Sequence, residues 1–123
     1  MFDKGDKMVF EQFVAKVCKQ DARNKFAAGN NNLEFLPEFY HVYDPVDVEF
    51  CSQIGTVRMF SIAEIQTETE DYAYLGLDFV FATINGDPLF VKNNAVYVCD
   101  HGSTTPTLEK ISDSFEEFLK SIV

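Results

Sequence analysis

Residues 78–99 read DFVFATINGDPLFVKNNAVYVC. Three apolar runs in this stretch carry hydrophobic side chains at both odd and even positions, which is typical of strands covered on both faces. Asn85-Gly86 and Asn93-Asn94 separate the runs, and both pairs tolerate the positive φ that two-residue hairpins require. The stretch therefore predicts three consecutive antiparallel strands in the middle of a sheet.

Two more strands and a helix are expected before this stretch. Residues 46–50 alternate apolar and acidic side chains, as in a strand with one buried and one exposed face. Residues 56–60 predict the next strand. Ser61 and Glu64 then form a capping-box pattern, and a helix of about ten residues should follow, ending near Asp71.

Amphipathic helices are expected at both ends of the chain. Residues 7–28 show apolar side chains at helical spacing, with Gly29 in the position of a C-terminal cap. A short helix or turn is expected at Leu36-Pro37. Ser112 or Asp113 can cap a final helix with an apolar stripe; the stripe consists of Phe115, Phe118, Leu119 and Ile122.

These patterns together predict one α+β domain over residues 1–123. Its centre is an antiparallel β-sheet with meander topology, and the N-terminal and C-terminal amphipathic helices flank the sheet. The chain has 123 residues, of which 46% are hydrophobic. A chain of this length buries about 65–70% of its unfolded surface, which is enough for one core without disulfides.

The charge balance restricts the classes of partner. Ten basic residues stand against twenty acidic ones, so the formal net charge is −10. This sign disfavours direct binding to nucleic acid or to an anionic membrane, because both attract positive surfaces. No apolar run approaches the roughly 18 residues of a membrane span, and the first residues do not resemble a signal peptide.

The cysteines agree with a reducing compartment. Cys18, Cys51 and Cys99 are an odd number and lack C-x-x-C spacing. A secreted disulfide scaffold has an even and denser set. Each cysteine has an apolar neighbour in the sequence, so we expect buried free thiols in a cytoplasmic protein.

Catalytic candidates are few. The common nucleotide-binding, hydrolase and metalloprotease motifs are absent from the sequence,. Cys99 and His101 share one face of a predicted strand, but a zinc site or a nucleophile–base pair needs further groups from elsewhere. Asp47 and Glu49 are both expected in solvent, whereas acid–base catalysis needs two distinct environments. We therefore expect no enzyme, no metal and no cofactor.

Acidic residues are concentrated in the middle of the chain. Residues 31–91 contain eleven acidic residues and one basic residue, Arg58. The acidic segments are either ordinary solvated faces or one patch that steers a basic protein partner. Tyr40, Tyr43, Tyr72 and Tyr74 flank these segments, and tyrosines are favoured interface anchors. The residues predicted to bind the partner are Tyr43, Asp44, Asp47, Glu49, Glu68, Glu70, Asp71 and Tyr72.

Five short motifs follow one another in an order that resembles the SUKH superfamily. The similarity covers roughly residues 36–123, and this family groups bacterial immunity proteins with the yeast cell-wall-assembly regulator and the Syd protein. The motifs are Leu36-Pro37-Glu38-Phe39-Tyr40, Phe60-Ser61-Ile62-Ala63-Glu64-Ile65, the segment 81–89 with Asn85-Gly86-Asp87-Pro88-Leu89, the segment 96–102 with Asp100-His101-Gly102, and Ile111-Ser112-Asp113-Ser114-Phe115-Glu116-Glu117-Phe118-Leu119.

The resemblance implies an α+β fold and a binding role rather than catalysis. Many bacterial members are similar to immunity proteins that neutralise a cognate toxin, often a nuclease, of a polymorphic toxin system. The expected partner is then one basic protein, a toxin domain. The alternatives are a regulatory or scaffold module, for example in cell-wall synthesis, and an enzyme or small-ligand protein with a deep pocket. An edge strand at 46–50 can pair two copies, although its acids discourage this, so we expect a monomer or a weak homodimer.

Overall fold

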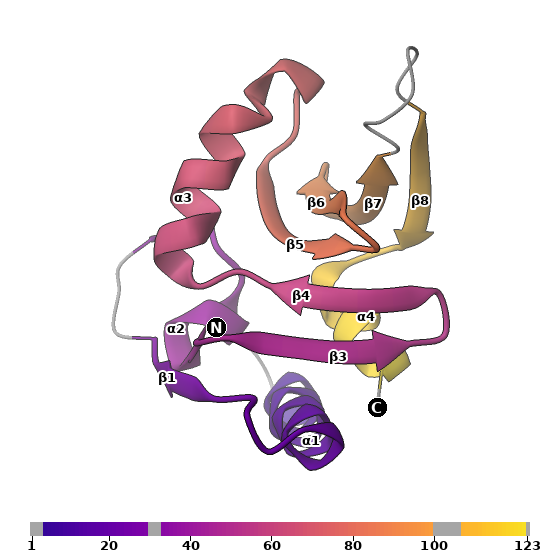
Figure 1. Ribbon diagram of the computed structural model, residues 1–123. Helices are drawn as coiled ribbons and strands as arrows, with labels where there is room; N and C mark the ends of the chain where they lie inside the picture. Colours follow the sequence, from indigo (N-terminus) through magenta and orange to yellow (C-terminus); the bar gives the residue numbers. More distant parts are fainter. Residues whose placement is uncertain (1–3, 30–32, 100–106, 123) are drawn as a thin grey trace.

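The computed structural model describes residues 4–29, 33–99 and 107–122. Its main layer is a six-stranded antiparallel sheet in the order β3-β4-β5-β6-β7-β8 (Figure 1). Every strand pairs with the next one along the chain, so the predicted central antiparallel meander is confirmed. The six strands are Val48–Ser52, Gly55–Met59, Phe79–Ile84, Asp87–Lys92, Ala95–Cys99 and Leu108–Ser112.

The two predicted hairpins join the middle strands. The φ angles are 50° at Asn85 and 88° at Gly86, and they are 52° at Asn93 and 71° at Asn94. Positive φ at both turn residues matches the right-handed twist of the flanking strands, and asparagine and glycine adopt it at low cost. β5, β6 and β7 therefore form consecutive hairpins, as the segment 78–99 predicts.

Helices at both ends of the chain flank this sheet, as predicted. α1 packs against α4 and β3, α4 contacts β7 and β8, and α3 lies along β5 (Figure 1). The helices are α1 (Lys4–Gln20), α2 (Glu38–Val42), α3 (Ile62–Asp71) and α4 (Phe115–Ile122), with one 3-10 turn, η1 (Ala73–Leu75). A second, two-stranded sheet consists of β1 (Phe26–Ala28) and β2 (Tyr43–Pro45).

Aromatic side chains fill the space between the helices and the sheet. The buried ring of Phe39 lies 5.5 Å from Phe10, 5.7 Å from Phe13 and 5.9 Å from Phe115, measured between centroids. Phe13 also meets Phe50 of β3 at 5.5 Å. These contacts tie α1, α2, α4 and the sheet into one core, which explains the high phenylalanine content of the chain.

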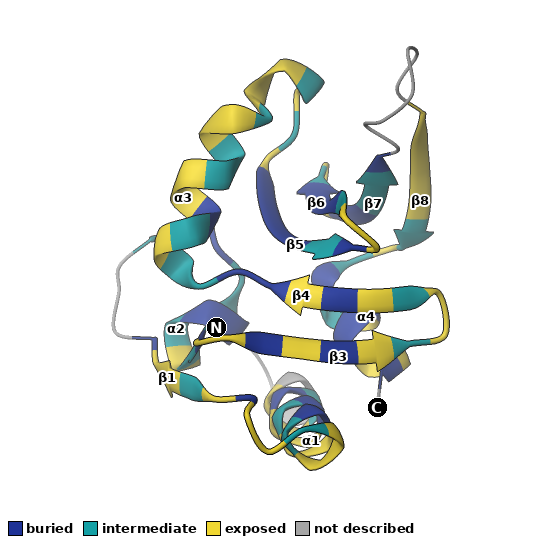
Figure 2. Cartoon of the chain, in the orientation of Figure 1, coloured by how far each residue is buried: buried dark blue, intermediate teal, exposed yellow. Residues whose placement is uncertain are grey.

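α3 begins and ends where the sequence predicts. The Ser61 hydroxyl accepts the Glu64 N–H at 3.2 Å, and the Glu64 carboxylate accepts the Ser61 N–H at 3.0 Å. This reciprocal capping box satisfies two N–H groups at the start of the helix. Figure 2 shows that exposed and half-buried residues dominate α3, whereas β5 is almost wholly buried. α3 therefore presents a long side to solvent.

The predicted first helix, residues 7–28, is wrong at its C-terminal end. α1 stops at Gln20 because the Asp21 carboxylate accepts the Arg23 N–H at 2.9 Å and forms a tight turn,. Residues 26–28 then pair with β2. Gly29 is not a helix cap: its N–H donates to the Val42 carbonyl, and a Cβ there would collide with the Tyr40 carbonyl.

Two other local predictions need correction, and one strand was not predicted. The strand predicted at 46–50 begins at Val48, because Asp47 has a φ of 67° and breaks the extended chain. α4 is capped by Ser114, whose hydroxyl accepts the Glu117 N–H at 3.0 Å, and not by Ser112, which ends β8, or Asp113. β8 has no recognisable strand pattern, because residues 108–110 are all exposed and their side chains do not alternate between a buried and an exposed face.

The cysteine prediction holds for one residue of three. Cys99 is buried, Cys18 is half-buried, and Cys51 is exposed on the outer face of β3. Phe50, the apolar neighbour of Cys51, points into the core. Because successive side chains of a strand point to opposite faces, Cys51 points outward,. Among the described residues, no helix combines the length and the apolar character needed to cross a membrane.

Candidate partner-binding surface

Two of the predicted acids, Asp47 and Glu49, lie beside the turn that follows α1. Asp47 and Glu49 line a shallow hollow of about 170 Å³ together with Asp21, Arg23 and Asn24. Asp21, Asp47 and Glu49 are called the β3 acidic group below. The Arg23 guanidinium lies 2.7 Å from the Asp21 carboxylate. Arg23 is therefore a basic residue inside a predicted acidic site.

Arg23 acts on the carboxylates around it. Its side-chain and main-chain hydrogen bonds lower the pKa of Asp21 to about 2. The Asp21 hydrogen bond is the main cause of a raised Arg23 pKa, and the charges of Asp47 and Glu49 add to it. The guanidinium is hydrogen-bonded to Asp21, whereas Asp47 and Glu49 influence it through their charge alone.

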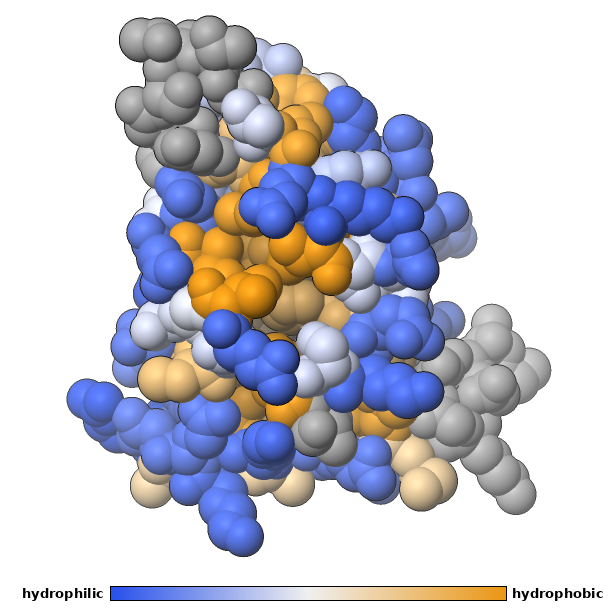
Figure 3. Space-filling view, turned by 90° about the vertical axis from the view of Figure 1, so that its right-hand side faces the viewer, coloured by the Kyte–Doolittle hydropathy of each residue, from blue (hydrophilic) through white to orange (hydrophobic). Residues whose placement is uncertain are grey.

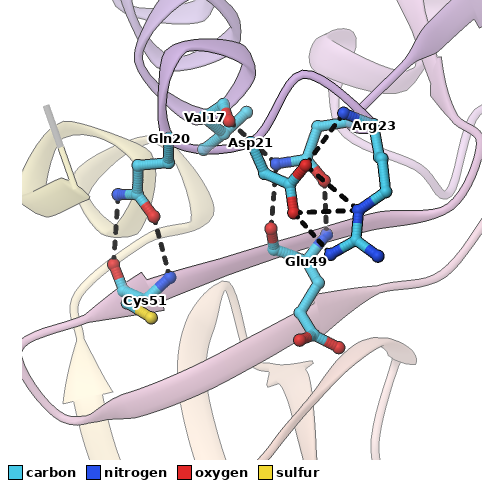
Figure 4. Close-up of polar contacts among 7 residues, drawn as sticks. Val17, Gln20, Asp21, Arg23, Glu49 and Cys51 are labelled. Atoms are coloured by element: carbon cyan, nitrogen blue, oxygen red, sulfur yellow. Dashed lines mark hydrogen bonds and ion pairs between the residues drawn. The ribbon is translucent and has the colours of Figure 1, made fainter.

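The local fold fixes the direction of Glu49. The side-chain amide of Asn24 donates to the Glu49 carbonyl at 2.8 Å and accepts the Glu49 N–H at 2.9 Å (Figure 4). The same amide donates to the Val17 carbonyl of α1 at 2.8 Å. With the main chain of Glu49 held to the end of α1, alternation along β3 turns its carboxylate to solvent,.

Three other predicted acids gather at the C-terminal end of α3. Glu68, Glu70 and Asp71 lie in its last turn, which contains no basic residue; they are called the α3 acidic group below. Carboxylates at this end oppose the helix macrodipole at a cost of about 0.3–1 kcal/mol each when exposed. The end of α3 is therefore strongly negative although this weakens the helix.

Asp44 differs from the other predicted acids because the fold uses it. Its carboxylate accepts the Ile62 N–H, in the first turn of α3, at 2.8 Å. Glu64, in the same turn, forms the capping box and an ion pair of 3.2 Å with Arg58. Asp44 and Glu64 thus stabilise the start of α3, where negative charge is favourable.

The contact between Asp44 and Ile62 also relates the two acidic groups in space. It holds Asp44, three residues before Asp47, at the N-terminal end of α3, while the α3 acidic group lies at the other end. At 1.5 Å per residue, the ten residues of α3 extend about 15 Å from this contact to the α3 acidic group,. A typical interface covers about 800 Å² on each partner, roughly 30 Å across, which is about twice this length.

The four tyrosines have different environments. Tyr40 is fully buried, so it cannot serve as an interface anchor. Tyr43 is half-buried against Phe39 at 5.3 Å, and burial raises its pKa. Tyr72 follows α3, where burial and then the Glu68 charge raise its pKa. Tyr74, 71% exposed, lies 6.4 Å from the Tyr72 ring, so these two tyrosines adjoin the α3 acidic group.

A separate face of the molecule carries an apolar patch. Figure 3 shows hydrophobic residues gathered in the middle of the face that carries the β3–β4 turn, β8 and α4. Two adjoining hollows on this face share Ile54 and Ile111. Ile54 is 53% exposed in the β3–β4 turn. None of the residues predicted to bind a partner lines these hollows.

The thiol and the histidines considered for catalysis lie in different places. Cys99 is buried, and His101 lies outside the described residues. His41 bonds to the Leu33 carbonyl at 3.1 Å and lies 3.7 Å from the Glu38 carboxylate, both close in sequence. Within the described part of the chain, no group of three His, Cys, Asp or Glu side chains is placed to hold a metal ion.

The sequence-based site omitted Asp21 and Arg23. Both precede Asp44, the first of the predicted acids, by more than twenty residues, and the sequence predicted them inside a continuous helix. The Asp21-x-Arg23-Asn24 segment is a turn-forming pattern, and this was the available signal for the end of α1,. A correct helix end brings both residues to the start of β3.

Compared with protein-family models, curated proteins and solved structures, the chain gives no significant match to any of them.

Proposed function

We propose that the chain is a non-catalytic binding domain that docks one basic protein through an acidic strip. The strip consists of the β3 acidic group (Asp21, Asp47 and Glu49) and the α3 acidic group (Glu68, Glu70 and Asp71). The observation that carries this proposal is the last turn of α3, where acids accumulate against the helix dipole and no base offsets them,. Folding alone favours basic residues at this position, so a use in binding accounts for the acids.

The electrostatics favour a partner that is itself positive over a broad area. The net charge of −10 attracts such a protein at long range, and the strip orients it on contact,. A nuclease must be basic where it holds phosphate, and an acidic strip is complementary to that surface. Together with the resemblance to the SUKH superfamily, this supports an immunity protein that neutralises a bacterial toxin.

The experiment is a pull-down from lysate of the source cells with three tagged forms of the full chain. One is the wild type, one neutralises the strip (Asp47→Asn, Glu49→Gln, Glu70→Gln and Asp71→Asn), and one is a control for two of these charges (Glu109→Gln and Glu117→Gln). The control acids are exposed and lie on β8 and α4, away from the strip. Asparagine tolerates the positive φ of Asp47, so the fold should persist,.

A single basic protein that the wild type and the control retain, and that the strip variant loses, supports the proposal. Toxicity of this protein in a bacterial host, relieved by co-expression of the wild type, identifies an immunity pair. Retention of wall-synthesis proteins instead supports the regulatory alternative. Equal retention by all three forms overturns the acidic strip, and the absence of any retained protein overturns the binding role.

A further inference from the structure

A cavity of about 760 Å³ lies between the start of α2, the start of β5 and the first turn of α4. This volume falls within the range of pockets that bind small molecules, so it leaves room for a single side chain. The floor is apolar and buried, and it is made of Leu36, Phe79, Val91 and Phe115. The cavity is therefore suited to an occupant with an apolar portion.

One wall is an aromatic ring that is open to solvent. Phe35 lines the cavity and is 50% exposed. Its ring stands edge-to-face on buried Phe79 with 6.3 Å between centroids, and this contact holds it in place,. Leu77, half-buried, also lines the cavity. An exposed, fixed aromatic ring beside a cavity is an available surface for stacking by a planar group.

Among the described residues that line the cavity, the charged side chains are Asp78 and Glu116, and none is a lysine or an arginine. The Asp78 carboxylate accepts the Asn93 N–H at 3.0 Å, which fixes its position while it remains exposed. The first turn of α4 carries a partial positive charge, but the Ser114 cap and two glutamates in this turn offset it,. The charge of the lining thus complements a cation.

We propose that this cavity binds an arginine side chain of the basic partner. The apolar stem would lie against Leu77 and the ring of Phe35, with the guanidinium near Asp78 and Glu116. Arginine fits better than lysine because its guanidinium is planar, stacks on aromatic rings and is more weakly hydrated. The inference rests on the proposed function and adds to it one residue of the partner, an arginine that anchors the interface. Arginine is among the residue types that contribute most to binding energy at interfaces.

The test uses a peptide probe and does not need the natural partner. The ¹⁵N-labelled full chain is titrated with acetyl-Gly-Arg-Gly-amide and, separately, with the citrulline analogue, which has nearly the same shape but no charge. Low ionic strength keeps the charge interaction measurable. We expect the arginine peptide to shift the amide resonances of Leu77, Phe79 and Val91, and the citrulline peptide to bind at least about fivefold more weakly.

Two variants locate the binding within the cavity. Glu116→Gln is expected to weaken the arginine peptide about threefold, the loss for one partly exposed charge pair. Glu117→Gln is the matched control, because Glu117 is exposed in the same turn but does not line the cavity. Phe35→Ala should weaken the arginine peptide as well.

Equal binding of both peptides, equal effects of the two glutamate variants, or shifts confined to the acidic strip each overturn the cavity as an arginine site. The titration is independent of the pull-down. Lack of arginine-specific binding therefore overturns this inference even when a partner is found through the strip.

Discussion

The side-chain amide of Asn24 pairs with the main chain of Glu49 as a neighbouring strand would. β3 is one edge of the six-stranded sheet, and its outward N–H and C=O groups are open to another strand unless something covers them,. Gln20 repeats the arrangement two residues along: its amide accepts the Cys51 N–H at 3.0 Å and donates to the Cys51 carbonyl at 3.3 Å (Figure 4). Two amides thus close this edge.

Replacement of Asn24 by alanine should destabilise the fold. Asn24 is 5% exposed and makes three hydrogen bonds to main-chain groups. Its loss leaves the part-buried N–H and carbonyl of Glu49 without their partner and removes one of the two donors to the Val17 carbonyl. This is expected to lower the free energy of unfolding by about 1–3 kcal/mol. Urea denaturation followed by circular dichroism measures this change.

Gln20→Ala is the control for this prediction. Its two hydrogen bonds are exposed, so water replaces them, and the expected cost is about 1 kcal/mol or less,. Similar losses of unfolding free energy for Asn24→Ala and Gln20→Ala would contradict the idea that burial makes the hydrogen bonds of Asn24 contribute more to stability than those of Gln20.

Removal of both amides should open the edge to a second copy of the chain. We expect the double variant Gln20→Ala with Asn24→Ala to form dimers at concentrations where the wild type is monomeric, because β3 then offers unpaired main-chain groups. The acids Asp47 and Glu49 repel each other across such a pair, so salt should strengthen the dimer. Sedimentation equilibrium at low and high salt measures both effects.

A thiol-free background removes a competing explanation for these dimers. Cys51 is exposed on β3 and can form an intermolecular disulfide, so every form also carries Cys51→Ser,. A double variant that stays folded and monomeric at high salt would show that the two amides do not guard the edge.

The parts of the fold that the sequence predicted have signals within a few residues. The two Asn-containing hairpins and the Ser61–Glu64 capping box are local chemistry, and each occurs where its residues predict it. The alternation of apolar and acidic side chains in residues 46–50 also correctly predicted that Glu49 points outward. β8 gave no such signal, since its first three residues are all exposed.

The parts that the sequence did not predict depend on contacts between distant residues. Asn24 meets Glu49 across 25 positions, and Asp44 meets Ile62 across 18. The first contact helps to end α1 and brings Asp21 and Arg23 beside the predicted acids. The second assigns Asp44 to the start of α3. No pattern along the chain encodes either pairing, because both arise from tertiary packing.

Asp44 and Glu70 should respond to mutation in opposite ways. Asp44→Ala removes the acceptor for the Ile62 N–H and is expected to lower the free energy of unfolding by about 1 kcal/mol, as for the loss of a helix cap,. Glu70→Gln relieves an unfavourable charge at the end of α3, so stability should stay equal or rise slightly,. Urea denaturation of both variants tests this contrast.

The rate of association with the protein retained in the pull-down should rank the same two variants in the opposite order. Glu70→Gln is expected to slow association, because it removes a charge from the acidic strip. Asp44→Ala removes the same charge at a position that the fold already uses, so its effect should be smaller. Stopped-flow measurements at low salt provide the rates. A larger loss of rate for Asp44→Ala would place the binding surface at β2 rather than at the end of α3.

Arg23 should control the titration of Asp21. The Asp21 pKa of about 2 lies below its ordinary value of 3.8, mainly because the Arg23 side chain donates to the carboxylate. A lowered folded-state pKa stabilises the fold at pH values above 3.8, and this contribution is lost as the pH falls towards 2,. Arg23→Gln should raise the Asp21 pKa, although it should stay below 3.8 because the main-chain N–H of residue 23 still donates.

Carbon-detected NMR titration of the Asp21 carboxyl measures this pKa in the wild type and in Arg23→Gln. Arg58→Gln is the matched control, since Arg58 pairs with Glu64 and removal of its charge should leave Asp21 unchanged. Arg23→Gln also removes the basic residue beside the β3 acidic group, so it should speed association with a basic partner,. An Asp21 pKa that does not move in Arg23→Gln would mean that the turn at the end of α1, and not the ion pair, sets the charge state of this group.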